Sequence, residues 1–502
     1  MTREIVIFED SDKSTKEGYS VMKSIKKNYC YNLFYQILSV LIPLITAPYL
    51  SRVLGPEGIG AYSYTTSIVT YFTLFAAMGV SLYGQREVSY CQDNKERRTR
   101  VFWETKLLNF VSTGICFMIY LLLAIHSVKY RQLYLVLSIN IITVALNITW
   151  LFQGMEEFGK VVFRNTLFKI INVVFVFTCI HDKNDLLFYA LGTAAFSLLG
   201  EGSLWIGLPR LIGKPNWEIL HPFRDLKTII SLFIPTIAIS IYTVLDKTML
   251  GLLIGNIAEN GFYEQASKLS KVSLMFVTSL GTVMAPRVGH YVENHETANI
   301  KDAMYRSYRF VWFLGIPLCL GLLGISENLV PWFFGQGYDK VIPLVRILAW
   351  LVLAIGISNA TGLQYLIPTK RQHVFTLTVS LGALVNFICN WILIPKWASI
   401  GAAVGSIIAE TCVTFSQLIM VRKELSLKKV FVSSTHYWIA GIVMYLILLF
   451  EKGSFDASPV HTLIMILSGG LSYVLVLSLL HDIYVKGIIQ FIAHIMKREK
   501  IE

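Results

Sequence analysis

Charged side chains recur at helical spacing inside one long apolar stretch of the chain, residues 262–285. Glu264, Lys268 and Lys271 are four and then three residues apart, which places them on one face of an α-helix. Counted from Phe262, Lys271 lies roughly 13 Å along the helix axis, close to the middle of a bilayer. A charge at this depth needs an ionic partner or an aqueous cavity. We therefore expect either an ion pair between Glu264 and Lys268 or a cationic cavity wall.

A second stripe of the same kind lies in the apolar stretch 161–180. Lys169 stands between Asn165 and Asn172 at the same spacing, and it lies roughly 12 Å inside the stretch. Polar residues can also join helices to one another. However, stripes on five or more stretches, several of them holding cations, favour a shared cavity. Such a cavity attracts an anion, and phosphate is the obvious candidate.

Two carboxylates in apolar stretches, Asp246 and Glu410, could take part in ion coupling or in helix pairing. A structural ion pair with a nearby cation such as Lys247 is the alternative. Lys247 itself lies near the predicted outer boundary, where its ammonium group reaches the surface easily, so a structural role is expected for it. Arg346 is a further cation, in the outer half of the stretch 341–367.

Signals for enzyme chemistry are missing from the sequence. Gly154 and Lys160 match the spacing of a phosphate-binding loop, but Val161 stands where a Ser or Thr is required. The ten histidines are scattered without a zinc motif, and the seven cysteines show no paired spacing. We therefore expect no catalytic residues, no cofactor and no metal site, and we do not expect an enzyme.

The composition indicates that lipid is the solvent for much of the chain. Of the 502 residues, 54% are hydrophobic and 15% are charged, and the mean hydropathy is +0.58, whereas soluble proteins carry about 25% charged residues. The net charge of +12 is spread over short basic islands between apolar stretches. This pattern suits an anionic membrane surface and membrane lipids as partners, so nucleic acid is not expected.

Apolar windows of membrane-spanning length predict an all-α integral membrane protein with about fourteen transmembrane helices joined by short connections. If the N-terminus is inside, the inner segments hold 30 Lys and Arg residues and the outer segments hold 7. This ratio predicts that both termini are cytoplasmic. The predicted spans are 29–50, 60–84, 105–126, 132–153, 161–180, 186–207, 228–252, 262–285, 307–328, 341–367, 374–394, 401–420, 435–451 and 459–481.

Short motifs suggest an internal repeat with an offset of six spans. Ile42-Pro43 recurs as Ile234-Pro235, and Gly60-Ala61-Tyr62 corresponds to Gly261-Phe262-Tyr263. An even offset preserves orientation, so the repeat predicts two parallel six-helix lobes around a central cavity. The expected domains are an N-terminal lobe (1–227), a C-terminal lobe (228–430), and two extra spans with a cytoplasmic tail (431–502).

The segment 28–64, NYCYNLFYQILSVLIPLITAPYLSRVLGPEGIGAYSY, resembles the start of the Wzx-type flippases, which carry the lipid-linked repeat units of O-antigen and capsule. Further matches are YGQRE at 83–87, DKTMLG at 246–251 and IPTKRQ at 367–372. The resemblance implies membership of the superfamily that joins multidrug, oligosaccharidyl-lipid and polysaccharide exporters.

The resemblance also implies a mechanism. Such proteins work by alternating access between the two sides of the bacterial inner membrane. Their substrate is an undecaprenyl-diphosphate-linked oligosaccharide, which moves from the cytoplasmic to the outer leaflet. Polymerases or glycosyltransferases of the same pathway are candidate partners. Cavity cations are thought to hold the diphosphate and sugar acids, and residues that match this role by type are Lys169, Lys271, Lys268, Arg346, Arg52 and Arg86.

The last two of these, Arg52 and Arg86, lie at predicted span ends, where cavity access, interfacial anchoring and a structural turn are all open. Two other functions compete with the flippase. A small-molecule cation exporter of the same superfamily is disfavoured because a cavity rich in Lys and Arg repels cations. A membrane polysaccharide polymerase normally needs a sizeable outer loop, and the longest outer connection, near 329–340, is short.

Overall fold

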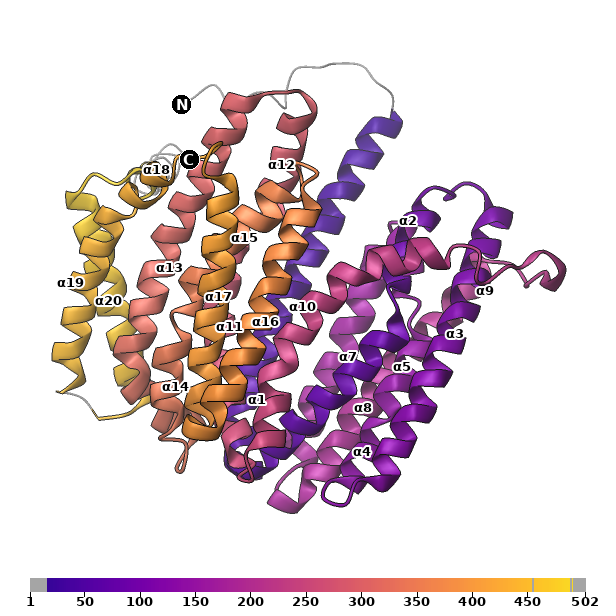
Figure 1. Cartoon of the computed structure of the whole chain (residues 1–502), viewed down its shortest axis with the longest axis horizontal. Helices are drawn as coiled ribbons and strands as arrows, with labels where there is room; N and C mark the ends of the chain where they lie inside the picture. The colour runs from indigo at the N-terminus through magenta and orange to yellow at the C-terminus, as the bar shows by residue number, and fades with distance from the viewer. Residues whose placement is uncertain (1–15, 454–455, 488–489, 491–502) are drawn as a thin grey trace, which may run out of the picture.

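The computed structural model describes residues 16–453, 456–487 and 490, and these residues contain helices and no β-strand. Figure 1 shows two groups of helices side by side. The N-terminal lobe contains α2 to α9, and the C-terminal lobe contains α11 to α20, with α19 and α20 on its outer flank. The first helices are α1 (Lys16–Ala77), α2 (Val80–Ser89), α3 (Lys95–His126), α4 (Arg131–Leu137), α5 (Ile139–Leu146), α6 (Thr149–Gly154), α7 (Phe158–Cys179), α8 (Leu186–Ser203) and α9 (Leu208–Leu211).

The helix α10 (Leu226–Leu253) runs between the two lobes and packs against α1 and α16. Its start lies close to the predicted lobe boundary at residue 228. The remaining helices are α11 (Ala258–Thr278), α12 (Gly281–Glu293), α13 (Thr297–Phe334), α14 (Val341–Leu348), α15 (Leu351–Thr361), α16 (Gln372–Trp397), α17 (Ser399–Val421), α18 (Leu427–Val432), α19 (Thr435–Lys452) and α20 (Pro459–Leu479).

Twelve helical segments of the described chain are long and apolar enough to cross a membrane. The chain is therefore a multi-pass membrane protein. Two features separate this number from the predicted fourteen. One segment, Leu41–Ser89, contains the predicted span 60–84 and part of the span 29–50, and α10, which coincides with the span 228–252, is not among the twelve. The count of fourteen stays a prediction.

The helix α1 reverses direction at Gly55. This residue has φ +67° and ψ 175°, which interrupts the helix, and only glycine adopts such a conformation without strain. Pro56 follows it, and proline is favourable at the first position of a helix. The first half of α1 (16–54) and its second half (56–77) therefore run in opposite directions (Figure 1).

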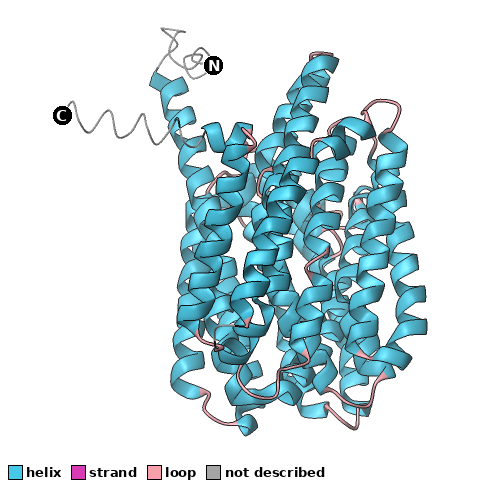
Figure 2. Cartoon of the chain, turned by 90° about the vertical axis from the view of Figure 1, so that its left-hand side faces the viewer, coloured by secondary structure: helices cyan, strands magenta, loops and turns pink. Residues whose placement is uncertain are grey.

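Loops gather at the two ends of the bundle (Figure 2). The end that holds the start of α1, the helix α18 and the end of α20 is called the terminal end (Figure 1). The opposite end, which holds the turn at Gly55, is called the Gly55 end.

The lobes touch closely at the Gly55 end, where α1 crosses α11. A Cβ atom added to Gly60 would lie 2.0 Å from the carbonyl oxygen of Ile257, and one added to Gly261 would lie 2.1 Å from that of Pro56. These are the two glycines that the repeat pattern pairs with each other. Small residues allow such backbone contact between membrane helices.

Candidate anion-binding cavity

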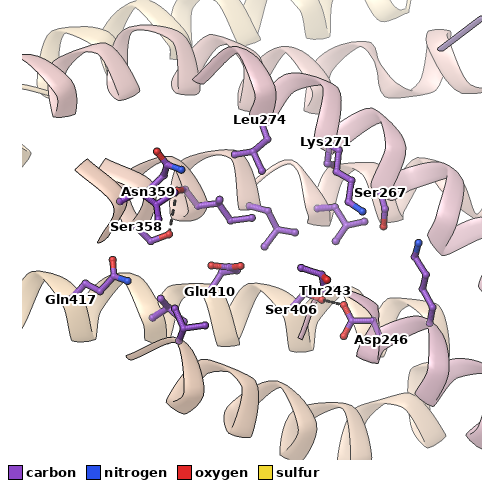
Figure 3. A pocket seen from close by; sticks show the side chains of 18 of the residues that line it. Thr243, Asp246, Ser267, Lys271, Leu274, Ser358, Asn359, Ser406, Glu410 and Gln417 are labelled. Carbon is purple, nitrogen blue, oxygen red and sulfur yellow. Dashed lines mark hydrogen bonds between the residues drawn. The ribbon is translucent and has the colours of Figure 1, made fainter. Parts of the chain in front are cut away.

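A cavity of about 360 Å³, here called the C-lobe cavity, lies between α10, α11, α15, α16 and α17. In Figure 3, Lys271 and Ser267 on α11 face Ser406 and Glu410 on α17. The wall is otherwise largely apolar and includes Leu274. The polar lining residues are Thr243, Asp246, Lys247, Tyr263, Ser267, Ser270, Lys271, Ser358, Asn359, Ser406, Glu410 and Gln417.

Lys271 is the cation that this cavity leaves available. Its side chain projects into the cavity (Figure 3). Within the described part of the chain it forms no hydrogen bond or ion pair. An ammonium group has three hydrogen-bond donors, so without a protein acceptor it can donate to the negatively charged oxygens of a ligand.

Glu264 organises the lysines next to this group. Its carboxylate lies 2.5 Å from Lys247 Nζ and 3.7 Å from Lys268 Nζ. The predicted ion pair between Glu264 and Lys268 is therefore present, and Lys247 is an additional partner. Together with Lys271, three ammonium groups stand around this carboxylate, but Asp246 and Glu410 line the C-lobe cavity as well, so the formal charges of these six groups sum to zero.

A hydrogen bond joins the same carboxylate to α1. The hydroxyl of Ser63, in the second half of α1, donates to Glu264 at 2.9 Å. Ser63 is almost fully buried. Sequence reasoning missed this residue, because a serine in an apolar stretch gives no signal of which helix it faces.

Asp246 is buried and is held by hydrogen bonds. Its Oδ1 accepts from Asn386 at 3.0 Å and from Asn390 at 2.6 Å. Its Oδ2 accepts from Ser406 at 2.6 Å and from Tyr263. These donors belong to α11, α16 and α17, so the carboxylate joins three helices to α10. The ion pair with Lys247 that was the alternative is not formed among the described residues, because Lys247 turns to Glu264 instead.

Glu410 lies on α17, one helical turn beyond Ser406, and its side chain faces the C-lobe cavity (Figure 3). It therefore shares the cavity wall with Lys271.

Lys169 lies in a different cavity, also of about 360 Å³, within the N-terminal lobe. Its Nζ donates to Ser39 Oγ at 2.6 Å. Asn165 and Asn172 line the same cavity, as the helical spacing predicted. Lys169 and Lys271 thus both face cavities, but the structure does not bring them into one cavity.

An ion pair lines this cavity, which is called the N-lobe cavity. Arg164 lies 2.8 Å from Glu201 and donates to Thr149 at 2.9 Å. Nearby, the buried Lys106 donates to Asn109 at 2.9 Å and to the carbonyl of Asn147 at 3.0 Å. Sequence reasoning missed Lys106, since it stands at the edge of a predicted span, where a lysine is expected to reach the membrane surface.

Four predicted cations line neither cavity, and one of them is Lys268, which pairs with Glu264. Arg346 pairs with Glu327 at 2.5 Å and donates to Ser326 at 3.0 Å. Arg52 donates to the carbonyl of Trp332 at the Gly55 end.

Arg86 pairs with Glu87 at 3.0 Å and lines a separate cavity that also involves Gln92 and Phe158. The grouping of Arg346, Arg52 and Arg86 with Lys271 thus fails in this structure. Residue type and depth do not report which way a side chain faces.

Comparison with known proteins places this geometry in a family. Residues 25–292, just over half of the chain, match the family model described as "Polysaccharide biosynthesis protein". The chain belongs to this family. Its relatives include the "Putative O-antigen transporter" of Escherichia coli K12, 23% identical over 412 residues, which cover 80% of this chain and 97% of the relative. A protein of the same name from Shigella dysenteriae is 24% identical, covering 79% and 100% of the two chains.

Solved structures share the fold. The lipid II flippase MurJ, in an inward closed conformation, superposes with a TM-score of 0.66 at 17% identity and covers 90% of this chain and 98% of its own. An inward-facing multidrug resistance MATE family transporter gives a TM-score of 0.61 at 12% identity, over 77% and 94% of the chains. The fold that the resemblance implied is therefore confirmed.

Proposed function

We propose that this protein moves lipid-linked oligosaccharide repeat units from the cytoplasmic to the outer leaflet of the bacterial inner membrane by alternating access. The observation that carries the proposal is Lys271, which faces an intramembrane cavity beside two further lysines. The names of the relatives support it, since both are called "Putative O-antigen transporter", and so does the fold shared with a lipid II flippase.

The charge of the cavity selects the part of the substrate that is hardest to move. A diphosphate in bare hydrocarbon carries a large desolvation penalty. Fixed ammonium groups reduce this penalty, and Lys271 offers one that pairs with no carboxylate among the described residues. The names of the relatives disfavour the multidrug exporter, whereas the cavity charge does not, because Asp246 and Glu410 also line the cavity.

Glu264 gives the site a way to release its ligand. It holds Lys247 and Lys268 through ion pairs. A bound diphosphate competes with Glu264 for these lysines, so the net gain on binding is smaller than three bare ammonium groups would give. Moderate affinity suits a carrier, which must let the substrate go on the other side.

Within this proposal, Lys169 offers a second anion contact in the N-terminal lobe. Asp246 and Glu410 take part in ion coupling or in helix pairing, and the hydrogen bonds around Asp246 support helix pairing for that residue. Arg52, Arg86 and Arg346 are not assigned to the anion site. The orientation, with both termini in the cytoplasm, rests on the distribution of Lys and Arg. A polymerase or glycosyltransferase partner follows from the pathway and has no assigned surface.

The test uses a strain that lacks the native gene and depends on this protein for surface polymer. Lys271→Ala should reach the membrane at normal levels and lose most polymer export, because the cavity loses its available cation. Lys271→Arg should restore part of the export. Leu274→Ala, which alters the same cavity wall without changing charge, is the matched control and should export normally.

Lys169→Ala tests the N-lobe contact in the same strain and should also reduce export. Full export by both the Lys271→Ala and the Lys169→Ala variants would refute the cationic mechanism. Loss of export in Leu274→Ala to the same extent as in Lys271→Ala would assign the effect to cavity shape rather than charge.

A further inference from the structure

A strongly basic cavity, here called the basic cavity, lies at the terminal end of the C-terminal lobe. It has a volume of about 860 Å³ and is formed by the start of α13, the loop after α17 and the short helix α18. It shares no lining residue with the C-lobe cavity. Figure 1 shows α18 at the periphery of the bundle, beside the upper part of α13. The site therefore faces the surroundings of the protein and not the transport path.

Four cations line the basic cavity, and its two carboxylates do not neutralise them. Asp302 is paired with Arg306, one turn along the same helix. Glu424 is bound by Arg371 at 2.8 Å and by the hydroxyl of Tyr365 at 2.5 Å. Both acids are thus satisfied by groups outside the lining.

The cations themselves have no carboxylate partner among the described residues, and Lys429 rests over the ring of Tyr305 at 5.7 Å. An excess of four positive charges around one concave surface calls for a polyanionic ligand. These four residues are Lys301, Arg422, Lys423 and Lys429.

Apolar side chains stand directly beside these charges. Phe431 and Val432, which follow Lys429 on α18, are 41% and 56% exposed. The helix is fixed in place by the buried Val430, whose carbonyl accepts a hydrogen bond from Trp312 at 3.0 Å. Val432 lies three residues after Lys429 on this helix and therefore shares its face, so charged and exposed apolar side chains stand next to each other, as at the boundary between lipid headgroups and acyl chains.

We propose that the basic cavity binds the phosphate group of an anionic phospholipid. The cations contact the phosphate oxygens, and the acyl chains lie along Phe431 and Val432. Basic pockets between membrane helices bind anionic headgroups for the same physical reason. A soluble phosphate offers the same oxygens, but it makes no use of the two exposed apolar side chains. This site is independent of the proposed transport function.

The experiment uses the purified full-length protein in a neutral detergent and measures binding of phosphatidylglycerol and of phosphatidylcholine by native mass spectrometry. The triple variant Lys301→Gln, Lys423→Gln, Lys429→Gln should bind phosphatidylglycerol about tenfold more weakly or worse. Binding of phosphatidylcholine should not change. The matched control is Lys428→Gln, since Lys428 is an exposed lysine of the same helix that does not line the cavity.

Two further arms identify the source of the phosphate. Phe431→Ser should weaken phosphatidylglycerol binding and leave the weak binding of inorganic pyrophosphate unchanged. Melting temperatures check that each variant is folded. The proposal is overturned if the folded triple variant binds phosphatidylglycerol like the parent, or if the parent binds both lipids equally. It is also overturned if the triple variant loses pyrophosphate binding alone, because the site then takes free phosphate.

Discussion

Ser63 on α1 donates a hydrogen bond of 2.9 Å to Glu264 on α11, near the Gly55 end. The same carboxylate holds Lys247 and Lys268. A ligand that draws the lysines away from Glu264 therefore also changes the charge that Ser63 meets. In the proposed mechanism, this links occupancy of the C-lobe cavity to the contact between the lobes.

The first prediction concerns this link. Glu264→Gln removes the charge that competes with the substrate, so the diphosphate should bind more tightly while export falls about tenfold, the scale of one hydrogen bond to a charged group. Ser63→Ala should reduce export by less, since Lys247 still holds the carboxylate. The measurements are polymer export and the affinity of the purified protein for pyrophosphate. The control is Thr70→Ala, because the Thr70 hydroxyl forms a hydrogen bond only within its own helix. The link would be contradicted if Glu264→Gln and Ser63→Ala both kept the export and the pyrophosphate affinity of the parent protein.

The glycine contact between α1 and α11 gives a second prediction. Gly60→Ala places a methyl group where the Ile257 carbonyl lies, so the lobes cannot close at the Gly55 end. Export should be largely lost, and a cysteine at Asn256 should react faster with a thiol reagent than in the parent. Gly114→Ala is the control because no atom lies within 4 Å of its added Cβ. A normal rate of both export and labelling in Gly60→Ala would show that closure does not need this contact.

Glu410 is the subject of a third prediction. If it exchanges a proton during transport, Glu410→Gln should flatten the dependence of export on external pH, because glutamine cannot titrate. Export is measured at several pH values in cells that express equal amounts of protein. An unchanged pH profile with normal expression assigns Glu410 to helix pairing.

The terminal end offers a fourth prediction, on acid stability. Burial raises the pKa of Asp225, but hydrogen bonds from Tyr83 and Arg224 outweigh this effect and hold the pKa below its ordinary value of 3.8. Asp225 lies just before the first residue of α10. A carboxylate with a lowered pKa stabilises the fold at neutral pH, and this contribution is lost only as the pH falls through the lowered value.

Asp225→Asn should therefore lower the melting temperature slightly at pH 7. At a pH low enough to protonate the parent carboxylate, the variant and the parent should have the same melting temperature. Thermal unfolding in detergent at pH 7 and at acid pH measures both. A difference between variant and parent that grows toward acid pH would contradict the assignment.

The fifth prediction concerns orientation. In a variant without its native cysteines, single cysteines at Asn94 and Lys214 should be protected from impermeant thiol reagents in intact cells. Single cysteines at Asp185 and Asp339 should be labelled. Labelling at Asn94 would reverse the proposed orientation.

The helices could be predicted from the sequence because hydropathy is a local property. The fold was predictable from the resemblance of short motifs to a known family. Gly60 and Gly261, which the repeat pattern pairs with each other, also lie in direct contact in the structure. The pair formed by Glu264 and Lys268 was predictable because both lie on one helix. The contact between Lys247 and Glu264 was not, since it depends on how α10 is rotated against α11. Arg346 shows the same limit, because its partner Glu327 lies on another helix and turns it away from both cavities.

The hydrogen bonds around Asp246 have a consequence for the direction of transport. They connect α10 with α11, α16 and α17, so in the proposed mechanism these four helices of the cavity wall move together. A substrate that enters from either leaflet then meets the same charges at the same spacing. Binding alone therefore favours neither direction of transport. The carrier is thermodynamically reversible, and net export is set by whatever removes the repeat unit on the far side or by a coupled ion gradient.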